Sequence, residues 1–92
     1  MQNLKILALN NNKIEDFPRV ILELNKLTSL RLSKNKLKAI PEDLIDHLPA
    51  ICELNLLNNE ITSLPLCLLN RSNLKLKYDR DKVKERPEVM QN

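Results

Sequence analysis

The sequence has no glycine and no tryptophan among its 92 residues, and it has only one phenylalanine and one tyrosine. Without glycine, neither a P-loop nor a dinucleotide-binding fingerprint is present, because both need glycine where the backbone closes on a phosphate. No apolar run approaches the roughly 20 residues that span a bilayer. Residues 1–12 hold too few apolar residues for a secretory signal. We therefore expect no bound cofactor and no membrane span.

Cysteine is also scarce, with Cys52 and Cys67 as the two thiols. In a chain without a predicted signal, two thiols are typical of free cysteines in a reducing compartment. We therefore expect a cytoplasmic protein, with the nucleus as an alternative. Cys67 lies in the apolar stretch LPLCLL and is predicted to be a small core residue, whereas Cys52 is predicted to be partly exposed.

The positive charge is concentrated at the C-terminal end. Residues 1–70 hold eight basic and eight acidic residues, whereas residues 71–92 hold seven basic and four acidic residues. This tail makes weak attachment to nucleic acid or a membrane surface one alternative function. A second basic cluster spans residues 31–38, but the neighbouring segments do not continue it. Nucleic-acid binding favours a continuous basic row with aromatic rings, so this partner is disfavoured.

One pattern occurs three times along the chain. The pattern is (Leu/Ile)-x-x-Leu-x-Leu-x-x-Asn-x-(Leu/Ile). Its three copies start at Leu4, Leu27 and Ile51. An apolar residue, a proline and a second apolar residue follow each copy. These positions are Phe17, Pro18 and Ile21, then Ile40, Pro41 and Leu44, then Leu64, Pro65 and Leu68. Eight positions that repeat in register three times indicate a repeat protein.

The spacing of this pattern predicts a wound backbone. Leu-x-Leu has the period of a strand with one buried face, and the outer apolar positions also point inward if the chain curves around them. Strands of successive coils then lie side by side and parallel. Asn12, Asn35 and Asn59 are predicted to bond backbone groups that the turns leave unpaired. One coil buries too little to fold alone, so stability comes from stacking.

The pattern resembles the leucine-rich repeat, in its intracellular 23-residue class, over about residues 4–70. The resemblance implies an α/β fold: a short right-handed solenoid with parallel strands on the concave face and turns or short helices on the convex face. We place the solenoid at residues 1–78, with repeats starting near residues 4, 27 and 51 and a degenerate fourth repeat over residues 71–78. Residues 79–92 are predicted to be a charged tail or cap.

The two ends depart from the pattern. A strict period would put Lys77 where an inward leucine belongs. We therefore favour a register in which Leu74 and Leu76 form the Leu-x-Leu pair, Asp79 replaces the asparagine and Val83 folds back. At the other end, the first repeat has no predicted cap, which offers a route to self-association.

The resemblance implies that the concave face binds a protein partner, whose identity the residues do not specify. Arg31 is the expected anchor, because arginine is enriched at binding hot spots, and a diagonal salt bridge to Glu53 is expected beside it. Lys75 and Tyr78 would extend the row. The outward positions are Ile6, Ala8, Asn10, Ser29, Arg31, Ser33, Glu53, Asn55 and Leu57.

No catalytic group is predicted. His47 is the single histidine, and we expect it on the convex surface beside Asp46. A metal site needs three or four ligands, and a hydrolytic triad needs a serine near the histidine; neither set is found. We therefore expect a non-catalytic interaction module. The main alternative is that the chain is an incomplete segment of a larger leucine-rich-repeat scaffold or signalling protein, with no separate function.

Overall fold

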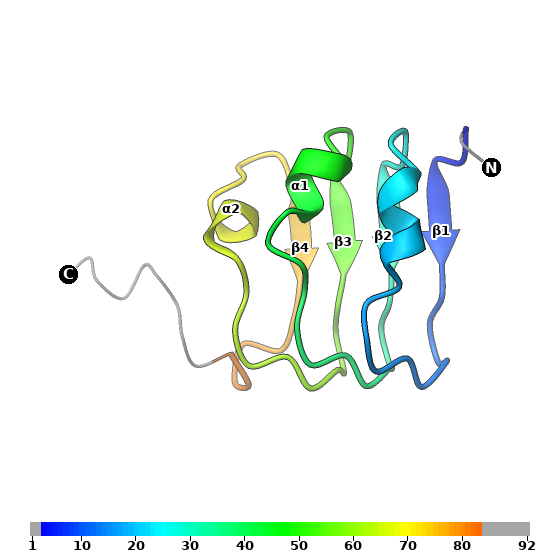
Figure 1. Cartoon of the computed structure of the whole chain (residues 1–92). Helices are drawn as coiled ribbons and strands as arrows, with labels where there is room; N and C mark the ends of the chain where they lie inside the picture. Colours follow the sequence, from blue (N-terminus) through cyan, green and yellow to red (C-terminus); the bar gives the residue numbers. More distant parts are fainter. Residues whose placement is uncertain (1–2, 84–92) are drawn as a thin grey trace.

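The computed structural model describes residues 3–83, which form stacked coils with one strand in each (Figure 1). The four strands are β1 (Ile6–Ala8), β2 (Ser29–Arg31), β3 (Glu53–Asn55) and β4 (Lys75–Lys77). They form one sheet in sequence order, and every neighbouring pair is parallel. The predicted repeat fold is therefore confirmed. Residues 84–92 of the predicted tail lie outside the described residues.

The middle residue of each strand points into the molecule. Leu7, Leu30, Leu54 and Leu76 are partners across the sheet. Leu30 and Leu54 have no exposed surface, whereas Leu7 and Leu76, on the two outer strands, are half-buried. Alternate residues of a strand point to opposite faces, so the first and third residues of each strand point outward.

Short helical segments cover the inner face of the sheet. These segments are the 3₁₀ helix η1 (Arg19–Glu23) and the α-helices α1 (Leu44–His47) and α2 (Leu66–Leu69). Pro18 and Pro65 immediately precede η1 and α2 in an extended conformation. The proline ring fixes φ near −65° and suits the start of a helix. In Figure 1 all three segments lie in front of the strands.

The core lies between these two layers and is almost entirely aliphatic. The predicted inward residues Ile21, Leu44 and Leu68 are buried, with at most 2% of the surface of each exposed to solvent. Further leucines and isoleucines from the strands and turns complete one cluster. Val83 is also buried in it, as expected of a residue that folds back.

The first coil is less well covered than the others. Leu4, Leu7, Leu9 and Ile14 are only partly buried, whereas the equivalent Leu27, Leu30, Leu32 and Leu37 have no exposed surface. No coil lies before β1 within residues 3–83. An apolar cavity of about 260 Å³ opens between β1 and η1. Self-association through this end stays a prediction.

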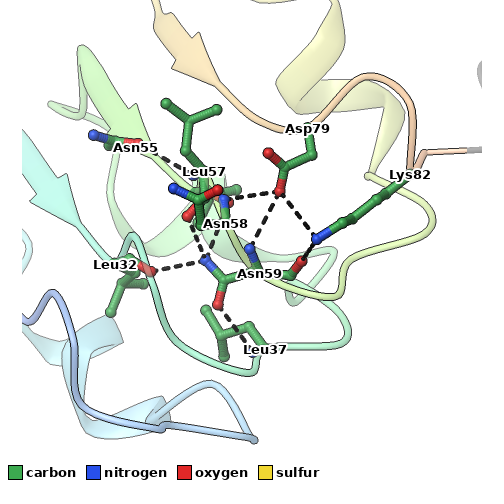
Figure 2. Close-up of polar contacts among 9 residues, drawn as sticks. Leu32, Leu37, Asn55, Leu57, Asn58, Asn59, Asp79 and Lys82 are labelled. Atoms are coloured by element: carbon green, nitrogen blue, oxygen red, sulfur yellow. Dashed lines mark hydrogen bonds and ion pairs between the residues drawn. The ribbon is translucent and has the colours of Figure 1, made fainter.

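Asn35 and Asn59 tie neighbouring coils together. The Asn59 Oδ1 accepts a hydrogen bond from the Leu37 N–H at 3.0 Å, and its Nδ2 donates to the carbonyls of Leu32 at 2.8 Å and Leu56 at 3.0 Å (Figure 2). Asn35 makes equivalent bonds to the first coil, including one to the Leu9 carbonyl. Both side chains are buried, so a polar group here completes backbone bonding that water cannot reach.

The structural role predicted for Asn12 is met only within its own turn. Asn12 is exposed, and within the described residues its side chain bonds only to the Asn10 carbonyl, two residues away. An asparagine in this turn is buried by bonding backward to the preceding coil. Since no described coil precedes β1, the Asn12 amide has no such backbone to bond.

The favoured register of the fourth coil was wrong. Leu76, not Leu74, is the partner of Leu54, one residue earlier than the strict period requires. Tyr78 then takes an inward position and packs against the core, so it does not extend the outward row. Asp79 nevertheless accepts hydrogen bonds from the backbone N–H groups of Asn58 at 2.8 Å and Asn59 at 3.2 Å (Figure 2).

The prediction that Cys67 is a core residue was wrong. Cys67 is exposed on α2, as is Cys52 at the entry to β3, and both cysteines are free. Leu68 fills the inward position of α2, and Cys67 precedes it on the outer side. The Sγ of Cys67 lies 3.6 Å from the Glu42 carbonyl oxygen of the previous coil.

Candidate protein-binding face

The outward strand residues form one open surface, which we call the sheet face. The helical segments cover the opposite side of the sheet (Figure 1), and no helix of the described chain covers this one. Two residues from each strand contribute to it, and they are aligned across the sheet by its parallel register. The sheet face consists of Ile6, Ala8, Ser29, Arg31, Glu53, Asn55, Lys75 and Lys77.

The chemistry of the sheet face changes from one edge to the other. On β1, Ile6 and Ala8 are exposed and apolar, with 58% of the Ile6 surface accessible. On β4, Lys75 and Lys77 are exposed and positively charged. Arg31 adds a third positive charge, and Glu53 is the single acid of the set. The face therefore runs from an apolar edge to a basic edge.

Glu53 lies at the centre of a polar cluster. Its Oε1 accepts a hydrogen bond from the Ser29 Oγ at 2.9 Å and lies 3.8 Å from an Arg31 guanidinium nitrogen. The predicted diagonal pair of Arg31 and Glu53 is thus formed. The Ser29 hydrogen bond, followed by the charges of Arg31, Lys77 and Lys75, lowers the pKa of the Glu53 carboxyl below its ordinary value. Glu53 is therefore ionised at neutral pH.

Ser29 contributes to the surface less than predicted. Only 6% of its surface is exposed, and its hydroxyl donates to Glu53. Ser29 belongs to the sheet face, but its hydroxyl is already bonded to the Glu53 carboxylate. Arg31 remains accessible, with 45% of its side chain exposed.

The row of residues after the strands is partly committed to the fold. The Asn10 Oδ1 accepts hydrogen bonds from both the N–H and the hydroxyl of Ser33, each at 2.8 Å. The Asn55 Oδ1 accepts one from the Leu57 N–H at 3.2 Å. All four residues are half-buried. Asn10 and Ser33 fasten the first coil to the second, so we expect them to shape the rim rather than supply free contacts.

Lys77 was missed as a member of the face. The stretch Leu74-Lys75-Leu76-Lys77-Tyr78 alternates apolar and basic residues, which places both lysines on one side. Tyr78 was expected to extend the row, but this position on the sheet face belongs to Lys77. Applying the strand period consistently would have assigned both residues correctly.

Acidic residues gather around the first two helical segments, η1 and α1. Residues 14–24 and 40–48 contain six acidic residues and one arginine. Arg19 bonds to Asp43 at 3.0 Å, and this hydrogen bond lowers the pKa of the Asp43 carboxyl. His47 is exposed at the end of α1 with its Nδ1 3.6 Å from the Asp43 Oδ2. Lys38 lines the same pocket as Glu15, Asp16 and Arg19, so this acidic region also holds cations.

Within residues 3–83, no group of three or more histidine, cysteine, aspartate or glutamate side chains is placed to hold a metal ion. No helix in this part of the chain is long and apolar enough to cross a membrane.

Comparison with known sequences identifies the family. The sequence model described as "Leucine rich repeat" matches residues 25–76, more than half of the chain. The chain therefore belongs to the leucine-rich repeat family, whose modules generally bind proteins and are generally non-catalytic. The matched range leaves out the first coil, which the structure nevertheless joins to the same sheet.

Three relatives illustrate how widely such coils are used. The chain is 34% identical over 70 residues to a probable serine/threonine-protein kinase of Dictyostelium discoideum, covering 76% of this chain and 6% of the relative. It is 41% identical over 61 residues to Receptor like protein 22 of Arabidopsis thaliana, covering 66% and 8%. It is 31% identical over 86 residues to bovine (Bos taurus) osteomodulin, covering 92% and 20%. The chain spans a fifth or less of each relative.

Proposed function

We propose that this chain is a non-catalytic module that binds another protein through the sheet face. One observation carries the proposal: the outer side of the sheet is uncovered by the described helices, although it holds exposed charged and apolar side chains. Stacked coils fix these side chains on a parallel sheet, so little conformational entropy is lost when a partner binds. Arg31 is the proposed anchor, because its guanidinium lies 3.8 Å from Glu53 on the sheet face and 45% of its side chain is exposed.

A second proposal concerns the context of the chain. The relatives are longer proteins of different kinds, and the chain corresponds to a small part of each. The chain is then a segment of a larger leucine-rich-repeat protein that contributes part of a longer recognition surface. Both proposals use the same sheet face, so they differ in how much of the surface this chain supplies.

We further propose that the protein works inside the cell, in the cytoplasm. Two exposed cysteines that are not paired with each other support this placement, because such thiols persist in a reducing compartment. Labelling intact cells with a membrane-impermeant maleimide tests it. Labelling of Cys52 and Cys67 only after lysis is expected, and labelling before lysis would place the chain outside.

The binding proposal is tested by comparing two charge reversals. Arg31→Glu changes the sheet face, and Arg19→Glu makes the same change on the helical side, where Arg19 is also well exposed. Partners captured from cell extract by the wild type are purified and their dissociation constants measured directly. We expect a partner that binds the wild type and Arg19→Glu with the same affinity. Its affinity for Arg31→Glu should be at least about tenfold lower. Equal binding to all three proteins would show that Arg31 is not part of the binding site and would contradict the proposed use of the sheet face.

A further inference from the structure

We propose that the sheet face is built for an acidic protein segment that carries an apolar side chain near one end. The inference depends on the proposed function, because it assigns the chemistry of the partner at the same face. It follows from the sequence of side chains across the four strands, from Ile6 and Ala8 on β1 to Lys75 and Lys77 on β4.

The charge of the face favours an acidic partner. Three cations, Arg31, Lys75 and Lys77, surround one acid, Glu53, whose Oε1 already accepts from Ser29 and lies near Arg31. Lys75 lies directly opposite Glu53 across the sheet, and Lys77 lies opposite Asn55. The two lysines therefore exceed what the single carboxylate can neutralise. Carboxylates of a partner would complete the pairing on β4.

The remainder of the molecule reinforces this preference. The region around η1 and α1 holds six acids and one arginine in residues 14–24 and 40–48, with Lys38 beside Glu15 and Asp16. An acidic segment is repelled by that region and attracted to the sheet face, so the charges of the protein favour its approach to the sheet face. A basic segment would be steered to the wrong side of the molecule.

Geometry sets the spacing of the partner's side chains. Neighbouring strands lie about 4.8 Å apart, so β2 and β4 are separated by roughly 10 Å and β1 and β4 by roughly 14 Å. An extended segment that crosses the strands advances about 3.3 Å per residue. Its acidic residues over Arg31 and the β4 lysines are then about three positions apart. An apolar residue over Ile6 lies about four positions from the acid over β4.

Nucleic acid fits this face less well than a peptide. None of the eight residues of the sheet face is aromatic, whereas single strands bind through stacking on aromatic rings. A phosphate backbone would also meet the Glu53 carboxylate at the centre of the face. The exposed Ile6 supplies an apolar contact that a peptide side chain can use.

The test uses fluorescence anisotropy with two labelled peptides and the full chain. One probe has a leucine followed at the predicted distance by a run of glutamates, and the other has serine in place of the leucine. The variant Lys75→Glu/Lys77→Glu is compared with Lys36→Glu/Lys38→Glu, which makes the same charge change at exposed positions off the face. Cooperative thermal unfolding at the wild-type midpoint is required of each variant before it is compared.

We expect the β4 double variant to weaken glutamate-probe binding by at least about tenfold and the off-face variant by less than about threefold. Equal losses would mean that the probe senses only net charge, which would overturn the proposal. Ile6→Thr should weaken the leucine probe by about three- to tenfold and leave the serine probe unchanged. Loss of both probes to the same extent would remove the apolar part of the proposal.

Two other occupants are separate outcomes of the same experiment. Single-stranded RNA could bind more tightly than the glutamate probe and lose this binding in the β4 double variant. That result would identify nucleic acid, not a peptide, as the partner. Salt-sensitive self-association in sedimentation velocity, also lost with these lysines, would make the acidic side of a second copy the occupant. Either result overturns the inference. A purified protein partner that needs Arg31 but not Lys75 or Lys77 would overturn it while the proposed function stands.

Discussion

Lys34 and Asn58 occupy the same position in successive coils, and both have a left-handed backbone, with φ of 58° and 61°. Each follows a strand by three residues and opens the turn that leads to the buried asparagine of its coil. Asn11, with φ of 64°, holds this place in the first coil. Asparagine tolerates the left-handed region better than other non-glycine residues. Lysine is therefore the least suited residue of the three.

Replacement of Lys34 by asparagine should stabilise the protein. We expect the free energy of unfolding to rise by about 0.5–1 kcal/mol, because the side chain would fit the left-handed conformation that the turn imposes. Urea denaturation followed by circular dichroism measures the change. Lys36→Asn is the matched control, since Lys36 is exposed but is not among the positive-φ residues. A larger gain at Lys36 would contradict the explanation.

Asn59 and Asn12 should differ sharply in their importance, although they occupy equivalent positions. Asn59→Ala would leave the Leu37 N–H and the Leu56 carbonyl without this partner, and the Leu32 carbonyl would keep only its bond from Asn35. We expect a loss of about 2–4 kcal/mol, since buried unsatisfied groups are costly. Asn12→Ala should cost less than about 0.5 kcal/mol, because the side chain is exposed. Comparable losses in urea unfolding would refute the role assigned to the preceding coil.

The pKa of Glu53 should depend on Ser29. The Ser29 hydrogen bond is the leading cause of the lowered pKa, so Ser29→Ala should raise the pKa of Glu53 toward its ordinary value. Side-chain carboxyl shifts in an NMR pH titration measure this change. Asp43 is the internal reference, because Arg19 lowers its pKa and Ser29→Ala should leave it unchanged.

The lowered pKa of Glu53 also fixes a direction of pH dependence. A carboxyl whose pKa is lower in the folded chain than in the unfolded chain contributes stability above its ordinary pKa. That contribution disappears as the pH falls through the folded-state pKa. The acid-induced loss of stability should therefore be smaller in Ser29→Ala than in the wild type. An unchanged pH dependence would show that this hydrogen bond is not formed in solution.

Cys67 should react as a surface thiol. Because it is exposed on α2, we expect labelling by a maleimide without denaturant at a rate similar to that of Cys52. Cys67→Ser should change the free energy of unfolding by less than about 0.5 kcal/mol. Mass spectrometry of single-cysteine variants separates the two sites. If Cys67 reacts only after the chain unfolds, it is buried in the core and this assignment is wrong.

The repeat spacing was sufficient to predict the sheet, because each strand's register is set by leucines that must meet in the core. Leu7, Leu30 and Leu54 are aligned as the pattern requires. Asn35 and Asn59 followed from the same logic, since a turn inside a stack leaves backbone groups to be bonded. The diagonal relation of Arg31 and Glu53 followed from the strand register alone.

The errors arose where a neighbouring coil decides the outcome. Asn12 has the right spacing but no described coil to bond to, and Leu74 has the right identity but Leu76 meets Leu54. Cys67 lies in an apolar stretch, yet Leu68 is the buried residue of α2 and Leu69 packs beside it against the core. Ser29 is buried and bonded to Glu53 of the next coil, which its outward strand position does not predict. The spacing of residues in the sequence does not predict these contacts.

Site-specific photo-cross-linking tests the central claim most directly. A photoreactive residue is placed at Asn55 on the sheet face, and in a matched variant at Leu66 on α2, where 51% of the surface is exposed. With the purified partner, we predict cross-links from position 55 and none above background from position 66. Cross-links from position 66 alone would place recognition on the helical side and contradict the account.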